Sequence, residues 1–166
     1  MKLFNDDCLK VLPTIPDKSI DLILTDPPYG TTVCKWDSII PFEPMWKELK
    51  RIIKDNGCIA LFGSEPFSSS LRISNIKQFK YDWIWQKSKC GSALNAKYKP
   101  LTKHEIISIF SKKKIKYFPQ MTEGKPYARN AKIGKINNHK YGLKYINVKN
   151  KGTRYPISVI SFQQKW

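Results

Sequence analysis

One short stretch is the most informative part of this chain: Ile20-Asp21-Leu22-Ile23-Leu24-Thr25-Asp26-Pro27-Pro28-Tyr29-Gly30. Residues 20–25 form a mostly apolar run rich in β-branched residues, which predicts a strand buried on both faces, as in the middle of a parallel sheet. The two prolines end that strand at once, because proline has no N–H to donate to a neighbouring strand. A carboxylate, two residues without a donor and an aromatic ring therefore follow directly from a strand end.

The residue types in this corner favour a planar substrate that carries an amino group. The Asp26 side chain and the Pro27 carbonyl are acceptors with little local competition, and Tyr29 offers a flat face for stacking. In an open α/β sheet, ligands bind beyond the carboxyl ends of the strands, which is where this corner is expected. The alternative is a purely structural turn, since prolines also punctuate strand ends.

The four residues Asp26-Pro27-Pro28-Tyr29 resemble the catalytic motif of the amino-group DNA methyltransferases, and the order of motifs resembles their beta class. These enzymes, found in restriction–modification systems, use S-adenosylmethionine to methylate N6 of adenine or N4 of cytosine. The resemblance implies that Asp26, Pro27, Pro28 and Tyr29 are catalytic and that Asp26 and Pro27 also lie near the cofactor. It also implies a target base that is flipped out of the duplex and stacks on Tyr29.

The opening of the chain predicts a short strand at residues 2–5, a turn and a helical segment that ends near Pro13. By resemblance, an acidic residue in this opening lies near the adenosine part of the cofactor, and Asp7 matches that place, with Asp6 as a second candidate. Helix capping by either aspartate is an equally supported interpretation.

The periodicity of residues 42–110 predicts a βαβ unit followed by two further strands. Residues 42–54 have the apolar spacing of one helical face, with Asp55-Asn56-Gly57 as the expected stop. Residues 58–62 predict a strand, 68–76 a helix, and 81–87 and 103–110 two more strands. We expect 63–67 to line the base or cofactor pocket and 31–41 to be a candidate lid. The fold class is therefore α/β, a partial Rossmann-like sheet of the S-adenosylmethionine-dependent type.

The net charge of +17 is unevenly distributed. Residues 1–80 carry 11 basic and 10 acidic side chains, whereas residues 81–166 carry 19 and 3. Lysine-rich composition can follow from genomic base bias, but this asymmetry favours double-stranded DNA as a partner. The expected DNA-binding residues are Lys89, Lys97, Lys99, Lys112, Lys113, Lys114, Lys116, Arg129, Lys132 and Arg154.

Two regions are expected: a catalytic half-domain at 1–110 with the Asp-Pro-Pro-Tyr motif, and a basic, mostly irregular region at 111–166. By resemblance the second is a target-recognition insert. Residues 111–155 interleave 13 basic side chains with six aromatic ones. Aromatic content of this kind favours partial order on DNA over a disordered basic tail.

The cysteines Cys8, Cys34, Cys58 and Cys90 have no C-x-x-C spacing, which favours reduced thiols and predicts no metal site. The sequence also has no run of about 18 apolar residues and no signal-peptide pattern. We therefore expect a cytoplasmic protein that does not associate with membranes.

The glycine-rich turn that holds the cofactor's methionine end in the family has no match here, because no G-x-G occurs in the 166 residues. We expect that half to be missing, so that the chain alone is unstable, associates, or needs a second polypeptide that carries the glycine-rich half. By resemblance the missing half contributes the central strands, so residues 20–25 are expected to leave a bare apolar edge. Binding of S-adenosylmethionine to the chain alone is expected to be weak or absent.

The preferred function is methylation of adenine N6 in DNA, because the aspartate form of the motif is commoner for adenine in the family. Three alternatives stay open: an N4-cytosine methyltransferase, a non-catalytic DNA-binding remnant, and an RNA or protein methyltransferase with the same four residues.

Overall fold

The computed structural model describes residues 1–134 and 143–162, with the side chains of 130–134 and 143–146 outside that description. The chain forms two compact units, one made of Met1–Lys116 together with the segment that begins at Ser158, and one made of Tyr117–Ile157. The expected boundary at residue 110 differs from this division. The reason is that residues 159–161 return to the first unit as a strand of its sheet.

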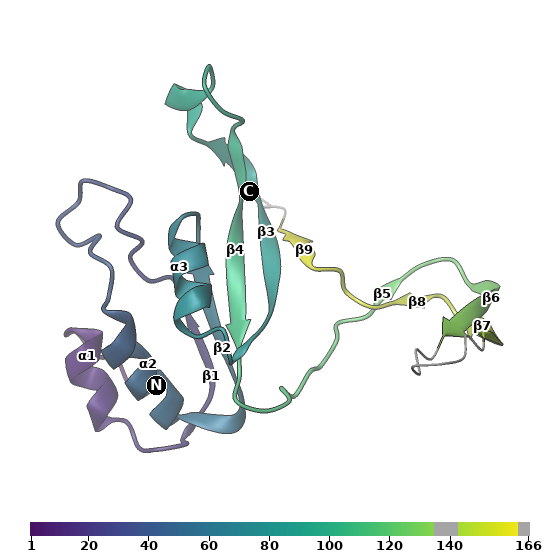
Figure 1. The fold of residues 1–166 in the computed structure, drawn as a ribbon, viewed down its shortest axis with the longest axis horizontal. Coiled ribbons are helices and arrows are strands. Elements are labelled where there is room, and N and C mark those ends of the chain that lie inside the picture. The colour runs from purple at the N-terminus through teal and green to yellow at the C-terminus, as the bar shows by residue number, and fades with distance from the viewer. Residues whose placement is uncertain (135–142, 163–166) are drawn as a thin grey trace. The chain divides into compact units, whose positions relative to one another are not determined.

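The first unit is built on a five-stranded sheet in the order β1-β2-β4-β3-β9 (Figure 1). The strands are β1 (Ile20–Thr25), β2 (Ile53–Gly63), β3 (Phe79–Gly91), β4 (Thr102–Phe110) and β9 (Val159–Ser161). β1 and β2 are parallel, β4 is antiparallel to both β2 and β3, and β9 is parallel to β3. The carboxyl ends of β1, β2 and β3 and the amino end of β4 therefore meet at one edge.

The helices are α1 (Cys8–Val11), the 3-10 turns η1 (Leu12–Thr14) and η2 (Ala93–Asn95), α2 (Phe42–Ile52) and α3 (Phe67–Ser74). The apolar face of α2 and residues Phe67 and Leu71 of α3 pack on Ile59, Leu61 and Phe110 of the sheet. This cluster is the main core, and it confirms the helical periodicity of 42–52. Among the described residues, none of the helices is long and apolar enough to cross a bilayer.

The opposite face of the sheet is covered much less completely. Ala60, Ile107 and Ile109 are buried there, with Trp83 and Trp85 partly buried beside them. No residue from a helix joins this second cluster in the part of the chain that the structure describes. The sheet is thus covered by helices on one face only, and a doubly wound sheet covers both.

β1 is an edge strand, so the expectation of burial on both faces is wrong. Leu22 and Leu24 pair with Cys58 and Ala60, which places them on the less covered face, and they are 55% and 60% exposed. The physical reason is that β2 alone pairs with β1 in the described chain. The apolar strand edge expected from the sequence is present.

Two predicted element bounds are also corrected. Residues 2–5 form no strand, and Leu3 and Phe4 are exposed, because a strand needs a neighbouring ladder and none lies beside them. The helix of 42–54 ends at Ile52, and Asp55-Asn56-Gly57 belong to β2. Ile53 already pairs with Ile20, and the register then shifts before Leu22.

The second unit contains more strand than the irregular region expected. β6 (Tyr127–Gly134) and β7 (Leu143–Asn150) pair antiparallel over their full lengths, and β5 (Thr122–Glu123) pairs with β8 (Thr153–Arg154). Lysine and asparagine have low strand propensity, so the sequence did not predict this hairpin.

Candidate active site

The corner after β1 has the acceptors that the sequence predicts. Pro27 is buried and the Asp26 side chain is exposed. The Tyr29 hydroxyl donates a short hydrogen bond to Oδ1 of Asp26. Within the described residues no hydrogen bond reaches the Pro27 carbonyl, so its oxygen and Oδ2 of Asp26 stay available as acceptors.

Tyr29 is held from two sides. Its ring stacks on Phe67 of α3 with centroids 5.1 Å apart and an interplanar angle of 28°. Burial, the hydrogen bond to Asp26 and the negative charges of Asp26 and Glu105 raise the pKa of Tyr29 above its usual range. The phenol is therefore a neutral donor with one ring face packed on Phe67.

Asp37 is the main anchor of the loop that follows the motif. Its Oδ1 accepts the N–H groups of Tyr29 and Gly30, both at 2.8 Å, and its Oδ2 accepts those of Thr31 at 2.9 Å and Thr32 at 2.7 Å. Hydrogen bonds from the Thr32 side chain and from these backbone groups lower the pKa of Asp37 to about 2.

The turn around Asp37 needs a glycine at position 30. Gly30 has φ +67°, a conformation that side chains disfavour, and a Cβ there would lie 3.0 Å from Cγ1 of Ile39. The candidate lid at 31–41 is thus tied at its beginning to its own Asp37.

A cavity of about 310 Å³ opens at this corner. Its volume lies at the lower end of the range of small-molecule sites, roughly 300–1,000 Å³. The exposed indole of Trp36 forms part of its wall. The lining residues are Asp26, Pro27, Pro28, Tyr29, Thr31, Thr32, Trp36 and Asp37.

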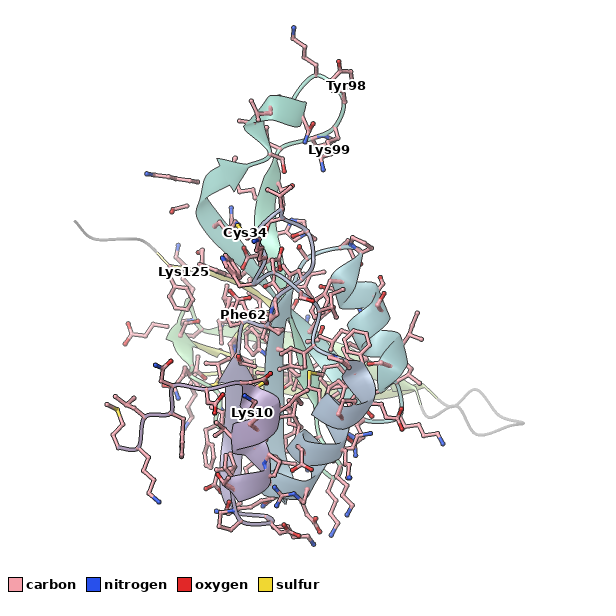
Figure 2. All side chains as sticks on the ribbon, turned by 90° about the vertical axis from the view of Figure 1, so that its left-hand side faces the viewer. Lys10, Cys34, Phe62, Tyr98, Lys99 and Lys125 are labelled. Atoms are coloured by element: carbon pink, nitrogen blue, oxygen red, sulfur yellow. The ribbon has the colours of Figure 1, made fainter. Side chains whose placement is uncertain are left out.

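A second cavity of about 580 Å³ lies at the same edge of the sheet, and Thr31 lines both. Gly63, Ser64 and Glu65 line it, as expected for the segment after β2. Nζ of Lys87 lies 2.6 Å from Oε1 of Glu105 in its wall. Lys99 also lines this cavity, and Figure 2 shows Lys99 and Tyr98 near the tip of the β3–β4 connection.

Asp7 occupies the N-cap position of α1, where its Oδ1 accepts the N–H of Leu9 at 2.8 Å. Helix capping is thus observed. A role for Asp7 beside the cofactor stays a prediction.

The lysines expected to bind DNA in the first unit fall at two opposite ends of the sheet. Lys89, Lys97 and Lys99 are exposed on β3 and the β3–β4 connection, at the same edge as Asp26. Lys112 and Lys113 follow the carboxyl end of β4 and form ion pairs with Asp55, at 3.6 and 3.0 Å. Lys114 and Lys116 come next and are exposed. The structure therefore does not bring these four lysines to the edge of the sheet that carries the Asp-Pro-Pro-Tyr motif.

In the second unit, Arg154 has several intramolecular partners. It donates to Asn150 Oδ1 at 2.6 Å and to the Lys125 carbonyl at 2.5 Å, and its guanidinium lies 4.8 Å from the centre of the Tyr127 ring. Arg129 lies 5.6 Å from the same ring and is exposed. The side chain of Lys132 lies outside the described residues. DNA contacts by these residues stay predictions.

Sequence reasoning assigned no individual role to Asp37, Phe67 or Glu105, although Asp37 lies in the candidate lid at 31–41 and Phe67 in the segment 63–67 that was expected to line a pocket. Asp37 had one usable signal, because a lone aspartate a few residues after a glycine in an irregular segment can accept backbone N–H groups. Phe67 stacks on the Tyr29 ring, and Glu105 acts on Tyr29 through its negative charge. Both effects depend on the tertiary fold, for which the sequence carries no local pattern.

Comparison with known families gives a match over most of the chain. Residues 20–159 match the family described as DNA methylase, whose members modify N6 or N4 amino groups. The type II methyltransferase M.HinfI of Haemophilus influenzae is 33% identical over 114 residues, covering 52% of this chain and 31% of that protein. The type II methyltransferase M1.MboII of Moraxella bovis is 29% identical over 144 residues, covering 80% and 54%. The chain spans only about a third to a half of the length of these curated relatives.

Two solved structures have the same fold. The SAM complex of M1.HpyAVI aligns with a TM-score of 0.52 at 19% identity, covering 75% of this chain and 60% of that one. The cytosine-N4-specific PvuII DNA methyltransferase aligns with a TM-score of 0.51 at 18% identity, covering 66% and 48%. The partial Rossmann-like sheet expected from the sequence is thereby confirmed. Since the family match includes the motif, β1 and the sheet built on it, the chain belongs to the N6/N4 amino-methyltransferase family of DNA methylases.

Proposed function

We propose that this chain forms the base-binding side of a DNA methyltransferase that methylates N6 of adenine and uses S-adenosylmethionine. The observation that carries the proposal is the corner at the end of β1. There the Asp26 carboxylate and Pro27 border a cavity of about 310 Å³ beside an aromatic ring. Membership of the family narrows the reaction to an exocyclic amino group.

The corner has the groups that activation of an amine requires. The lone pair of an exocyclic amine is delocalised into its ring, so the nitrogen is a weak nucleophile. Asp26 Oδ2 and the Pro27 carbonyl can each accept one N–H of that amine, which favours a pyramidal nitrogen with its lone pair directed away from both acceptors. Preorganised acceptors of this kind stabilise the transition state without rearranging during the reaction.

The residues of this chain fit one part of S-adenosylmethionine. The cofactor, when bound, supplies a methyl group from a sulfonium, and the amino nitrogen loses one proton in the exchange. The Asp26 carboxylate matches the positive charge of the sulfonium, and Asp7 keeps Oδ2 free beside its capping bond. The methionine carboxylate needs backbone N–H donors of the glycine-rich type, which these 166 residues do not contain.

We further propose that a segment outside these 166 residues, in the same or a second polypeptide, pairs with the free edge of β1. Leu22 and Leu24 are exposed on an edge strand, and the sheet face that they share carries no helix among the described residues. A parallel strand with a following helix would satisfy both features, and its glycine-rich turn would complete the cofactor site.

A methyl-transfer assay tests the proposed function. The protein is incubated with methyl-labelled S-adenosylmethionine and mixed genomic DNA, with and without the product of an adjacent reading frame that encodes a glycine-rich segment. We expect label in N6-methyladenine after digestion to nucleosides. Label in N4-methylcytosine would show that the methylated base is cytosine and not adenine. Salt-dependent duplex binding without transfer would favour the DNA-binding remnant, and label in RNA or peptide alone would favour the third alternative.

Isothermal titration calorimetry tests the proposed missing segment. The chain alone is titrated with S-adenosylmethionine. We expect a Kd weaker than about 1 mM, which corresponds to a binding free energy of about −4 kcal/mol. Addition of the glycine-rich polypeptide is expected to lower this Kd. Tight stoichiometric binding to the chain alone would contradict the proposal.

A further inference from the structure

Asp37 is unusual because four consecutive backbone N–H groups, from Tyr29 to Thr32, converge on one carboxylate. An ionised carboxylate has about four acceptor positions, so these bonds use its whole capacity. Its side chain is 9% exposed, and no lysine, arginine or histidine pairs with it among the described residues. The negative charge is therefore stabilised by backbone N–H groups and the Thr32 side chain, and by no paired cation among the described residues.

These bonds fix the orientation of the peptide groups beside the motif. Because the peptide unit is planar, the bond from Tyr29 N–H to Asp37 fixes the plane of the Pro28–Tyr29 peptide. The ring of Pro28 fixes its φ, so the Pro27 carbonyl is only one soft dihedral away from that plane. With that plane held by Asp37, the direction of the Pro27 carbonyl is restricted to the one remaining rotation, ψ of Pro28.

The same bonds also set the direction of Tyr29. Its backbone is held by Asp37, its hydroxyl by Asp26 and its ring by Phe67. Asp37 lies in the wall of the cavity together with Asp26, but its oxygens are already taken by N–H donors. It is suited to hold the site in shape and poorly suited to accept a substrate hydrogen bond.

We propose that Asp37 is a positioning residue for methyl transfer, which holds the Pro27 carbonyl and Tyr29 where they meet the target amine. The assignment rests on the proposed function. It differs from a merely structural role because loss of Asp37 is expected to slow the chemical step while DNA affinity stays unchanged.

The test compares Asp37→Asn with Asp37→Glu. Asparagine has the same shape but only one acceptor oxygen, and its NH₂ faces N–H donors. We expect rapid amide hydrogen exchange at residues 29–32 and a kcat about 10²-fold lower with KM for DNA unchanged, as for a misplaced reacting group. Glutamate keeps both oxygens but displaces them, and an intermediate kcat is expected. Asp17→Asn is the matched control, because Asp17 is an exposed partner of Arg51 and does not line the cavity.

The outcomes separate this inference from the proposed function. Slow exchange at 29–32 in Asp37→Asn, a kcat equal to that of the wild type, or a rise in KM alone would overturn the role of Asp37. If Asp37→Asn does not fold, Asp37→Glu decides: a lower kcat supports positioning and an unchanged kcat overturns it. These assays include the glycine-rich polypeptide, and if the wild type transfers no methyl group in its presence, the proposed function fails. The exchange at 29–32 then still decides whether Asp37 holds the loop.

Discussion

The hydrogen bond from Tyr29 to Asp26 joins two of the residues that the motif predicts to be catalytic. Tyr29 is protonated at neutral pH because its pKa is raised above its usual range, so its hydroxyl can donate to Asp26. This bond occupies Oδ1 and leaves Oδ2 to the substrate. The ring of Tyr29 is a separate contribution, since it also packs on Phe67.

Two substitutions of Tyr29 separate the hydroxyl from the ring. Tyr29→Phe keeps the stacking on Phe67 and loses the bond to Asp26, and we expect the rate of methyl transfer to fall about 10- to 10²-fold, the effect of one hydrogen bond to a charged group of about 1.5–3 kcal/mol. Tyr29→Ala also loses the aromatic pair, worth about 0.5–1.5 kcal/mol beyond its buried area, and is expected to lower the thermal midpoint. Equal rates for the two variants would contradict this division.

The titration of Asp37 provides a prediction that needs no activity. Its pKa falls from an ordinary 3.8 to about 2 in the folded protein. A folded pKa below the unfolded one means that the stabilisation is complete above about pH 4 and is lost as the pH falls toward 2. The amide proton shift of Gly30, followed by NMR, is expected to titrate with a midpoint near 2 and to lose that titration in Asp37→Asn. A midpoint near 3.8 would contradict the four-bond arrangement.

Residue-level prediction from the sequence was uneven for a physical reason. Asp26, Pro27 and Tyr29 belong to one contiguous motif. Its chemistry can be predicted from the sequence because residue type determines which groups donate and which accept hydrogen bonds. Asp37 accepts hydrogen bonds from backbone N–H groups, which every residue except proline carries. The residue types of its partners therefore do not reveal these bonds in the sequence. Only the positive φ of Gly30 requires a particular residue type there.

At the scale of elements, β1 carries the motif at its carboxyl end and is also an edge strand with exposed apolar side chains. Ile23 faces the helices and joins the main core, whereas Leu24 faces the side without helices. An exposed apolar edge strand is a site for pairing with another chain.

A pair of substitutions on β1 tests this asymmetry. Leu24→Lys is expected to change the free energy of unfolding by no more than about 0.5 kcal/mol, as for an exposed position, and to reduce concentration-dependent self-association. Ile23→Lys is the matched control and is expected to destabilise the fold, because it places a charge against the core. Thermal melting and light scattering measure both effects. Equal destabilisation by the two variants would show that Leu24 is covered.

The elements themselves were largely predictable because their hydrophobic periods are strong. The helices at 42–52 and 67–74 and the strands β3 and β4 match the patterns that predicted them. The predictions of a strand at residues 2–5 and of burial on both faces of β1 were wrong, because both features depend on neighbouring strands. A local pattern predicts an apolar strand. Whether that strand pairs with another and is buried depends on the neighbouring elements in the fold.

At the scale of the whole molecule, the basic charge is shared by both units. The edge of the sheet that carries the Asp-Pro-Pro-Tyr motif belongs to the first unit, and Tyr117–Ile157 forms a compact unit of its own with nine basic side chains and one acidic side chain. The sequence placed the basic excess in residues 81–166 as a whole, which include the last part of the first unit. It did not predict that residues 159–161 return to the sheet as β9, because a three-residue strand has too little periodicity to be recognised.

The most direct test of the account is the single-turnover rate of methyl transfer to DNA by Asp26→Asn. Asp26 is exposed, so the variant is expected to fold, and Asp17→Asn is the matched control for loss of an exposed carboxylate. We predict a rate about 10²–10³-fold below that of the wild type, the usual cost of losing one preorganised group at the reacting centre. A folded Asp26→Asn protein that transfers the methyl group at the wild-type rate would contradict the assignment of this corner as the amine-binding site.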